Sequence, residues 1–135
     1  MQYVTHVLIV EDAENVRRAL VRGMRQEIER LEIAADLIEA DRADTAFERI
    51  LSSPGDRWFL ITDNDLNPSV GSMQTGLDLI RHVRENMPRI RSYRILVSGG
   101  MDPSVSDLSG VDMFMAKPWD VVKIIDLLVT FLASE

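Results

Sequence analysis

Short apolar runs alternate with longer amphipathic stretches along the chain. Runs rich in β-branched residues and bounded by charge or turn residues are typical of buried strands. Stretches with apolar residues every three or four positions are typical of helices that cover a sheet. The expected strands are 5–10, 33–38, 58–62, 93–98 and 111–116. The expected helices are 13–31, 43–51, 76–87 and 120–133, and 102–110 has room for only one short further helix.

The alternation of strands and helices predicts the fold class. It is typical of parallel strands joined by crossover helices that cover both faces of the sheet. We therefore expect an α/β fold with a doubly wound, five-stranded parallel sheet, in one domain spanning residues 1–135. In open sheets of this kind, ligands bind beyond the carboxyl ends of the strands. The residues that follow each strand are therefore the candidates for a functional site.

Polar groups that suit one site follow four of the five expected strands. In chain order they are Glu11, Asp12, Asp63, Asp65, Ser98, Lys117 and Pro118. Glu39 and Asp41 follow the remaining strand, and an edge position for that strand would keep them away from the centre. Clustered carboxylates repel one another, so either one of them is protonated or a cation lies among them.

This set of groups suits phosphoryl chemistry. An all-oxygen cluster favours Mg²⁺, which commonly takes one or two carboxylates together with a phosphate oxygen. A carboxylate oriented in this way can act as a nucleophile and form an aspartyl phosphate. Lys117 and the metal would neutralise the transferred group, and Ser98 would donate a hydrogen bond to one of its oxygens.

The sequence resembles the receiver domain of two-component response regulators, the CheY-like superfamily. The segments that carry the resemblance span most of the chain, and they are VLIVEDAENVRRAL at 7–20, FLITDNDLN at 59–67, GLDLIRHVR at 76–84, ILVSGG at 95–100 and MFMAKPWD at 113–120. The resemblance implies a flavodoxin-like fold with strand order 2-1-3-4-5. It also implies phosphotransfer from a histidine kinase or histidine phosphotransferase, in a signalling domain that catalyses only its own phosphorylation and dephosphorylation.

The resemblance implies a role for each matching residue. Asp63 is the expected phosphoacceptor, and Lys117 is the expected phosphate-binding lysine. The expected Mg²⁺ ligands are Glu11, Asp12, Asp63 and the backbone carbonyl of Asp65. Asp63 is a better nucleophile than Asp65 because it directly follows the strand, where the sheet still holds the backbone.

Three further positions complete the resemblance. Ser98 is the expected switch hydroxyl, although threonine is commoner there. Phe114 lies at the aromatic switch position, and a plain core role is equally open. The bond between Lys117 and Pro118 is expected to be cis, a form that proline permits and other residues rarely adopt.

Two segments depart from the family pattern. The loop after Asp63 is longer than usual, with an insertion at about 67–75 that either gates the site or is a tolerated surface loop. The segment between Ser98 and Lys117 is short, so the fourth helix of the family is expected to be shortened. This second change puts the family's usual signalling surface in doubt.

The composition excludes several classes of partner and site. A formal net charge of -7 argues against direct nucleic-acid binding, and the lack of cysteine excludes disulfides and zinc thiolates. The two histidines, His6 and His82, are far apart and are expected to be structural or solvated. No signal peptide is visible and no apolar stretch approaches the ~18 residues of a membrane span. A cytoplasmic location without membrane insertion is therefore expected.

The last expected helix carries more apolar residues than one stripe can bury. Val121, Ile125, Leu128 and Leu132 can face the sheet, whereas the two valines at 122 and 129 lie off that stripe. An exposed apolar strip marks an association site. It predicts a downstream protein target or a homodimer, with edge packing inside the domain as the alternative.

Two other functions stay open. Phosphatases of the haloacid dehalogenase group also use a strand-end Asp-x-Asp, then a hydroxyl and a lysine, with Mg²⁺; Asp63, Asp65, Ser98 and Lys117 fit that order. In that group, however, the nucleophile follows the first strand. The other alternative is a receiver-like binding module that is never phosphorylated. The sequence fits a stand-alone regulator and a receiver cut from a larger chain equally well.

Overall fold

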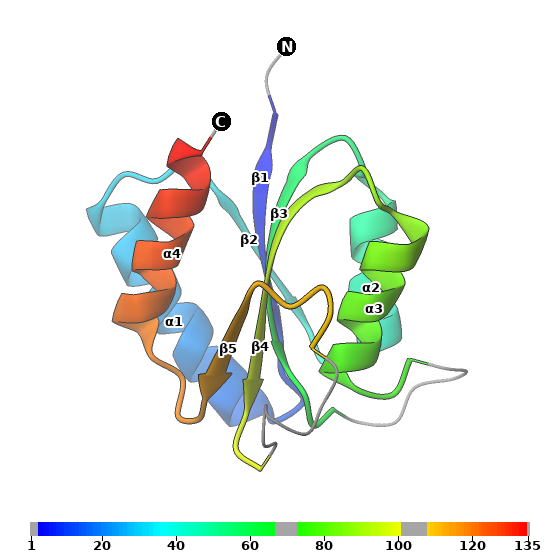
Figure 1. Ribbon diagram of the computed structural model, residues 1–135. Coiled ribbons are helices and arrows are strands. Elements are labelled where there is room, and N and C mark those ends of the chain that lie inside the picture. Colours follow the sequence, from blue (N-terminus) through cyan, green and yellow to red (C-terminus); the bar gives the residue numbers. More distant parts are fainter. Residues whose placement is uncertain (1–2, 67–72, 101–107, 135) are drawn as a thin grey trace.

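The computed structural model describes residues 3–66, 73–100 and 108–134. Its strands are β1 (Thr5–Val10), β2 (Asp36–Ala40), β3 (Arg57–Asp63), β4 (Arg91–Ser98) and β5 (Met113–Ala116). Its helices are α1 (Glu14–Arg30), α2 (Ala43–Leu51), α3 (Gly76–Asn86) and α4 (Val121–Ala133). The strands form one parallel sheet in the order β2-β1-β3-β4-β5 (Figure 1). The expected fold class and strand order are confirmed.

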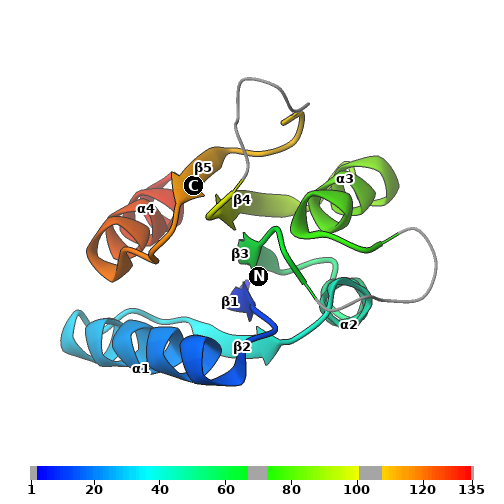
Figure 2. The ribbon, with the colours of Figure 1, turned by 90° about the horizontal axis from the view of Figure 1, so that it is seen from below.

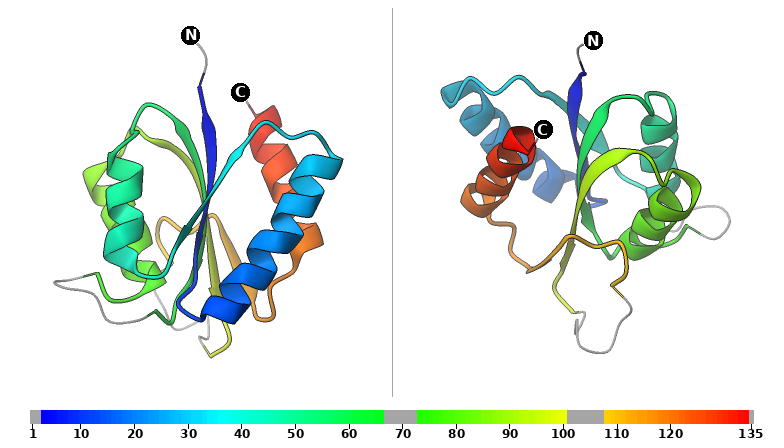
Figure 3. Two further views of the ribbon diagram at one scale, coloured as in Figure 1. Left: turned by 180° about the vertical axis from the view of Figure 1, so that it is seen from behind. Right: turned by 45° about the horizontal axis from the view of Figure 1, so that its top comes forward.

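The sheet lies between two layers of helices. Helices α1 and α4 cover one face, and α2 and α3 cover the other (Figure 2). The strands contribute side chains to the core on both faces of the sheet. In β1, Val7 and Ile9 pack toward α1 and α4, whereas Leu8 and Val10 pack toward α2 and α3. Helices α1 and α4 lie side by side and begin at the end of the sheet where the strands finish (Figure 3).

Most element bounds fall within two residues of the expectation, but β2 does not. It begins at Asp36, three residues later than expected. The backbone N–H of Ile33 donates to the carbonyl of Ile28, and Glu32 has a φ of 54°. The residues after α1 therefore close that helix before the chain enters the sheet. The expected helix at 102–110 and the insertion at 67–75 lie largely outside the described residues.

In the described part of the chain, every helix is too short or too polar to cross a membrane.

A histidine links three segments at the end of the sheet where β1 begins. The Nε2 of His6 lies 2.8 Å from Oδ2 of Asp56, and its Nδ1 lies 3.3 Å from Oδ2 of Asp36. The imidazole ring stacks on Trp58 with centroids 4.3 Å apart. The hydrogen bond from His6 lowers the pKa of the Asp56 carboxyl. His6 is therefore a structural residue, as expected.

Replacing Asp56 by asparagine is expected to destabilise the fold near neutral pH and to have less effect in acid. A carboxyl group with a lowered pKa stabilises the fold above its usual pKa of 3.8, and this contribution is lost as the pH falls through the lower folded value. Urea denaturation of Asp56→Asn and wild type between pH 6 and pH 3 measures this trend. A difference in unfolding free energy that stays constant over this range would contradict it.

Candidate metal and phosphoryl site

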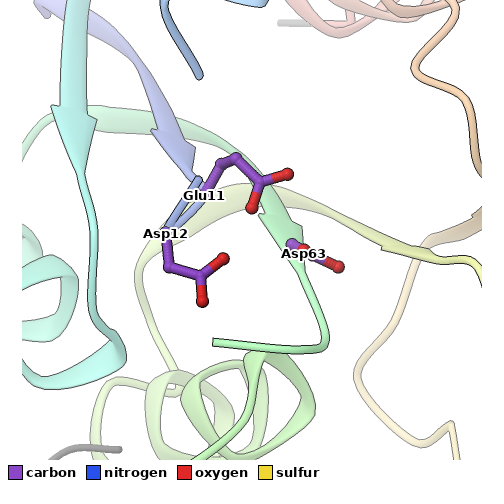
Figure 4. Close-up of side chains that lie close together, drawn as sticks. All are labelled: Glu11, Asp12 and Asp63. Carbon is purple, nitrogen blue, oxygen red and sulfur yellow. The ribbon is translucent and has the colours of Figure 1, made fainter. Parts of the chain in front are cut away.

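Three carboxylates meet where the two central strands end. Glu11 and Asp12 follow β1, and Asp63 ends β3, which pairs with β1. One oxygen from each of the three carboxylates lies within 4.8 Å of the others (Figure 4). Glu11 and Asp63 are each only 1% exposed, whereas Asp12 is partly exposed. The parallel topology thus brings together residues that are about fifty positions apart.

Lys117 supplies the positive charge at this cluster. Its Nζ donates to Oδ2 of Asp63 at 2.8 Å and lies 3.5 Å from Oε1 of Glu11. Burial would lower the pKa of Lys117, but its hydrogen bond to Asp63 and the charges of both carboxylates outweigh burial and raise it. The lysine therefore stays charged. The peptide bond that follows it, to Pro118, is cis.

Hydrogen bonds from neighbouring residues hold Asp63 in place. The N–H of Asp65 donates to Oδ1 of Asp63 at 3.3 Å, and the Thr62 hydroxyl donates to the Asp63 carbonyl at 2.9 Å. The side chain of Asp65 is exposed. Asp63 is thus the better fixed of the two aspartates, and a metal contact through the Asp65 carbonyl stays a prediction.

The environment of the Glu11 carboxylate is unfavourable for its charged form. The Ala13 N–H donates to its Oε2 at 3.3 Å, and Nη1 of Arg17 donates to its carbonyl at 2.8 Å. Its buried Oε1 has no hydrogen-bond partner among the described residues. Burial, a hydrogen bond with Asp12 and the charge of Asp63 raise the pKa of Glu11 to about 7. Although Nζ of Lys117 lies 3.5 Å from Oε1, the negative charge of Glu11 is therefore costly without a metal ion.

Ser98 and Phe114 belong to the two strands on one side of β3. Asp63 pairs with Val97, so Ser98 lies one position further along the neighbouring strand. Ser98 is buried, its hydroxyl accepts from the Gly100 N–H at 3.3 Å, and its carbonyl accepts from the Lys117 N–H. Phe114 is partly buried and packs against the core beneath α2 and α3, a position compatible with either role predicted for it.

Asp12 lies just before α1 but does not cap it. An aspartate before a helix often caps it, but the first helical residue of α1 is Glu14 and its N-cap is Ala13, which forms no side-chain cap hydrogen bond. The carboxylate of Asp12 lies with those of Glu11 and Asp63 instead. The position of Asp12 is therefore explained by the carboxylate cluster and not by capping of α1.

The sequence reasoning missed the residues that close the loop behind Asp63. The Gly76 N–H donates to the Asn64 carbonyl at 3.1 Å, and the Leu77 N–H donates to Oδ1 of Asn64 at 3.2 Å. A Cβ at Gly76 would lie 2.2 Å from the Asp63 carbonyl oxygen. Thr75 and Asp78 form a capping box at the start of α3, and their spacing is a signal that the sequence does contain.

The donor set fits Mg²⁺. All three candidate side chains are carboxylates, which are the ligands this hard cation prefers. The buried Oε1 of Glu11, which forms no hydrogen bond to a described residue, is an oxygen that a cation would satisfy. Glu11, Asp12 and Asp63 would hold the ion, and Lys117 would remain beside it.

Comparison with solved structures relates this arrangement to known proteins. The chain matches the response regulator receiver domain (CheY-like) from Methylobacillus flagellatus with 18% identity and a TM-score of 0.71, covering 95% of this chain and 98% of that one. It matches the receiver domain of NtrX from Brucella abortus with 20% identity and a TM-score of 0.70, covering 96% and 99%. For the signal receiver domain of an HD domain-containing protein from Pseudomonas fluorescens Pf-5, the identity is 19%, the TM-score is 0.71 and the coverage is 96% and 95%.

No protein-family model and no curated protein matches the sequence. At identities of 18–20%, the likeness to solved structures shows the fold. The chain has the fold of CheY-like response regulator receiver domains over nearly its whole length.

Replacing Gly76 by alanine is expected to destabilise the protein by roughly 3 kcal/mol or more, because the new methyl group would overlap the Asp63 carbonyl and force the backbone apart. Gly55→Ala is the matched control, since a Cβ there meets no atom within 4 Å. Urea denaturation measures both variants. Equal stability of the two would show that the loop adjusts without strain.

Replacing Glu11 by glutamine is expected to stabilise the metal-free protein at pH 8, by up to about 3 kcal/mol, and to have little effect at pH 5. A carboxyl group whose folded pKa is raised from 4.5 to about 7 lowers stability as the pH rises across that interval. Glutamine keeps the shape of the side chain without its charge. Thermal unfolding in EDTA at both pH values measures the difference, and a destabilised variant at pH 8 would contradict the expectation.

Proposed function

We propose that the chain is a phosphoacceptor receiver domain, which takes a phosphoryl group onto Asp63 with the help of Mg²⁺. One observation carries this proposal. In a receiver fold, the buried carboxylate of Asp63 contacts Lys117 at 2.8 Å and lies within 4.8 Å of the carboxylates of Glu11 and Asp12. A nucleophile, a cation and a metal-binding pair are thus in one place.

The chemistry follows from this geometry. A carboxylate oxygen of Asp63 attacks the phosphorus of a phosphohistidine on a histidine kinase or histidine phosphotransferase. The new O–P bond forms as the P–N bond breaks, and the electron pair stays on the imidazole nitrogen, which takes up a proton. When bound, Mg²⁺ neutralises the phosphoryl oxygens. The ammonium group of Lys117 carries part of the same charge, and its fixed position requires little rearrangement.

Phosphorylation of Asp63 would act on the protein surface through Ser98 and Phe114. Ser98 is buried at the end of the adjacent strand, from which its hydroxyl can donate to a phosphoryl oxygen. Phe114 is partly buried on the next strand, where it packs against the core, and an inward rotation of its ring would bury it further. A change at these two positions would alter a protein-binding surface for a downstream target. Such a phosphorelay implies a cytoplasmic location.

The two alternatives have less support. A dehalogenase-type phosphatase would place its nucleophile after the first strand and would aim the second aspartate at the substrate. Here Asp63 ends β3, and Asp65 is exposed and is not among the three carboxylates that lie together. A module that is never phosphorylated would have no need of a complete set of nucleophile, lysine and acidic pair.

Asp63→Asn is expected to abolish phosphorylation by acetyl phosphate, whereas Asp65→Asn is expected to retain it within about twofold. Only Asp63 supplies the nucleophilic oxygen, and Asp65 contributes its backbone N–H, which asparagine keeps. Intact-mass spectrometry after incubation with acetyl phosphate and Mg²⁺ measures the gain of one phosphoryl group.

Two controls accompany this experiment. EDTA is expected to suppress the labelling of the wild-type protein, and p-nitrophenyl phosphate is expected to undergo no sustained turnover. Equal labelling of the two variants would refute the assignment of Asp63. Sustained turnover that depends on Asp63 would favour the phosphatase, and a wild-type protein that never gains a phosphoryl group would favour the binding module.

A further inference from the structure

Arg17, near the start of α1, bonds to the backbone between two of the candidate metal ligands. Its Nη1 donates to the carbonyl of Glu11 at 2.8 Å. That carbonyl belongs to the peptide unit that joins Glu11 to Asp12, and the carboxylates of both residues lie in the cluster (Figure 4). Because a peptide unit is planar, a bond that fixes its carbonyl restricts the backbone rotation next to both Cα atoms. One guanidinium group thus orients the backbone that carries two candidate ligands.

The bond to Arg17 takes over where the pairing of the sheet ends. The N–H of Glu11 donates to the carbonyl of Ala40 at 3.1 Å, and Ala40 is the last residue of β2. The carbonyl of Glu11 comes directly after this bond, and its donor is a side chain of α1. The sheet therefore fixes one side of Glu11, and Arg17 fixes the side that leads to Asp12.

Glu39 holds the guanidinium group of Arg17 in this position. Nε of Arg17 donates to Oε1 of Glu39 at 3.0 Å. A planar guanidinium can bond to two acceptors in fixed directions. Glu39 belongs to the edge strand β2, opposite Ile9 of β1, and not to the loop after that strand. The edge strand is thus linked to the carboxylate cluster through Arg17, although the sequence placed its acidic residues away from the centre.

The stability of α1 does not explain the position of Arg17. The helix begins at Glu14, so Arg17 is its fourth residue, and a positive charge near the start of a helix opposes the helix dipole. The neighbouring Arg18 pairs with Glu14 inside the helix, and its side chain is 69% exposed. The side chain of Arg17 is only 15% exposed, and its bonds lead out of the helix to β2 and to Glu11.

We propose that Arg17 is a positioning residue for the metal site, which sets the orientation of Glu11 and Asp12, and that Glu39 sets the orientation of Arg17. This inference rests on the proposed function, because it concerns the carboxylates that would hold Mg²⁺. Groups that hold metal ligands in place commonly contribute about tenfold or more to metal affinity.

The role of Arg17 as a positioning group and its effect as a charge have opposite signs. A positive charge near the site repels a divalent cation, so an arginine that acted by charge alone would weaken Mg²⁺ binding, and its removal would strengthen it. An arginine that orients the ligands strengthens binding, and its removal weakens it. The direction of the change in affinity therefore distinguishes the two roles.

Arg17→Met is the first test, because methionine keeps a long apolar side chain but donates no hydrogen bond. Titration of the full chain with Mg²⁺, followed by amide NMR, is expected to show a Kd raised by about tenfold. Arg18→Met is the matched control, since it removes the same charge at the next position from an exposed ion pair. The control is expected to change the Kd by less than about twofold.

Two further variants separate geometry from charge and from folding. Arg17→Lys keeps the charge but cannot bond to both acceptors in the same plane, so it is also expected to raise the Kd, and it decides the outcome if the methionine variant fails to fold. Glu39→Ala is expected to raise the Kd in the wild-type background and to add little in Arg17→Met, because Glu39 acts through Arg17.

A spectroscopic signal tests the hydrogen bond without the metal. The carbonyl carbon NMR signal of Glu11 reports the bond from Arg17. In metal-free protein, this signal is expected to shift in Arg17→Met and to stay in place in Arg18→Met. A loss of stability alone would not reproduce this pattern.

Several results would overturn the positioning role. They are an Mg²⁺ affinity that both Arg17 variants leave unchanged, an affinity that Arg17→Met increases, and a Glu11 carbonyl signal that does not respond to Arg17→Met. A chain that binds Mg²⁺ in this pattern but accepts no phosphoryl group contradicts the proposed function and supports the role of Arg17. A wild-type chain that binds no Mg²⁺ contradicts both.

Discussion

The contact between Lys117 and Asp63 holds the functional end of this protein together. It spans 2.8 Å and joins the residue that ends β3 to the residue that follows β5, across the intervening β4. Three carboxylates that lie within 4.8 Å of one another would otherwise repel across a poorly solvated space. Since the lysine can neutralise only one of them, the cluster retains excess negative charge. This excess negative charge favours the binding of a divalent cation there.

Glu11 is the residue that this arrangement destabilises most in the absence of a metal ion. Its side chain is buried, one of its oxygens has no hydrogen bond to a described residue, and its raised pKa measures how poorly the metal-free site accommodates a charge. Functional sites commonly sacrifice local stability in this way. The two apolar layers of the fold compensate, because the central strands carry apolar side chains on both faces up to the residues where the site begins.

The spacing of apolar residues was sufficient to predict the fold. The parallel strand topology was sufficient to predict which residues form the carboxylate cluster. Parallel strands place their carboxyl ends along one edge, so reading the residue after each strand led to Glu11, Asp12, Asp63 and Lys117. The start of β2 was missed because Ile33 matches a strand pattern but is used to close α1. The role of Gly76 was missed because its close approach to the Asp63 carbonyl is a tertiary contact. Residue patterns report which face a side chain favours, but they carry no information about such backbone approaches.

The site and the outer face of α4 are covalently close. Only three residues separate Lys117 from Val121, the first residue of α4, and Asp120 caps that helix by accepting from the Lys123 N–H at 3.1 Å. A shift of Lys117 toward a phosphoryl group would therefore be transmitted to the start of α4.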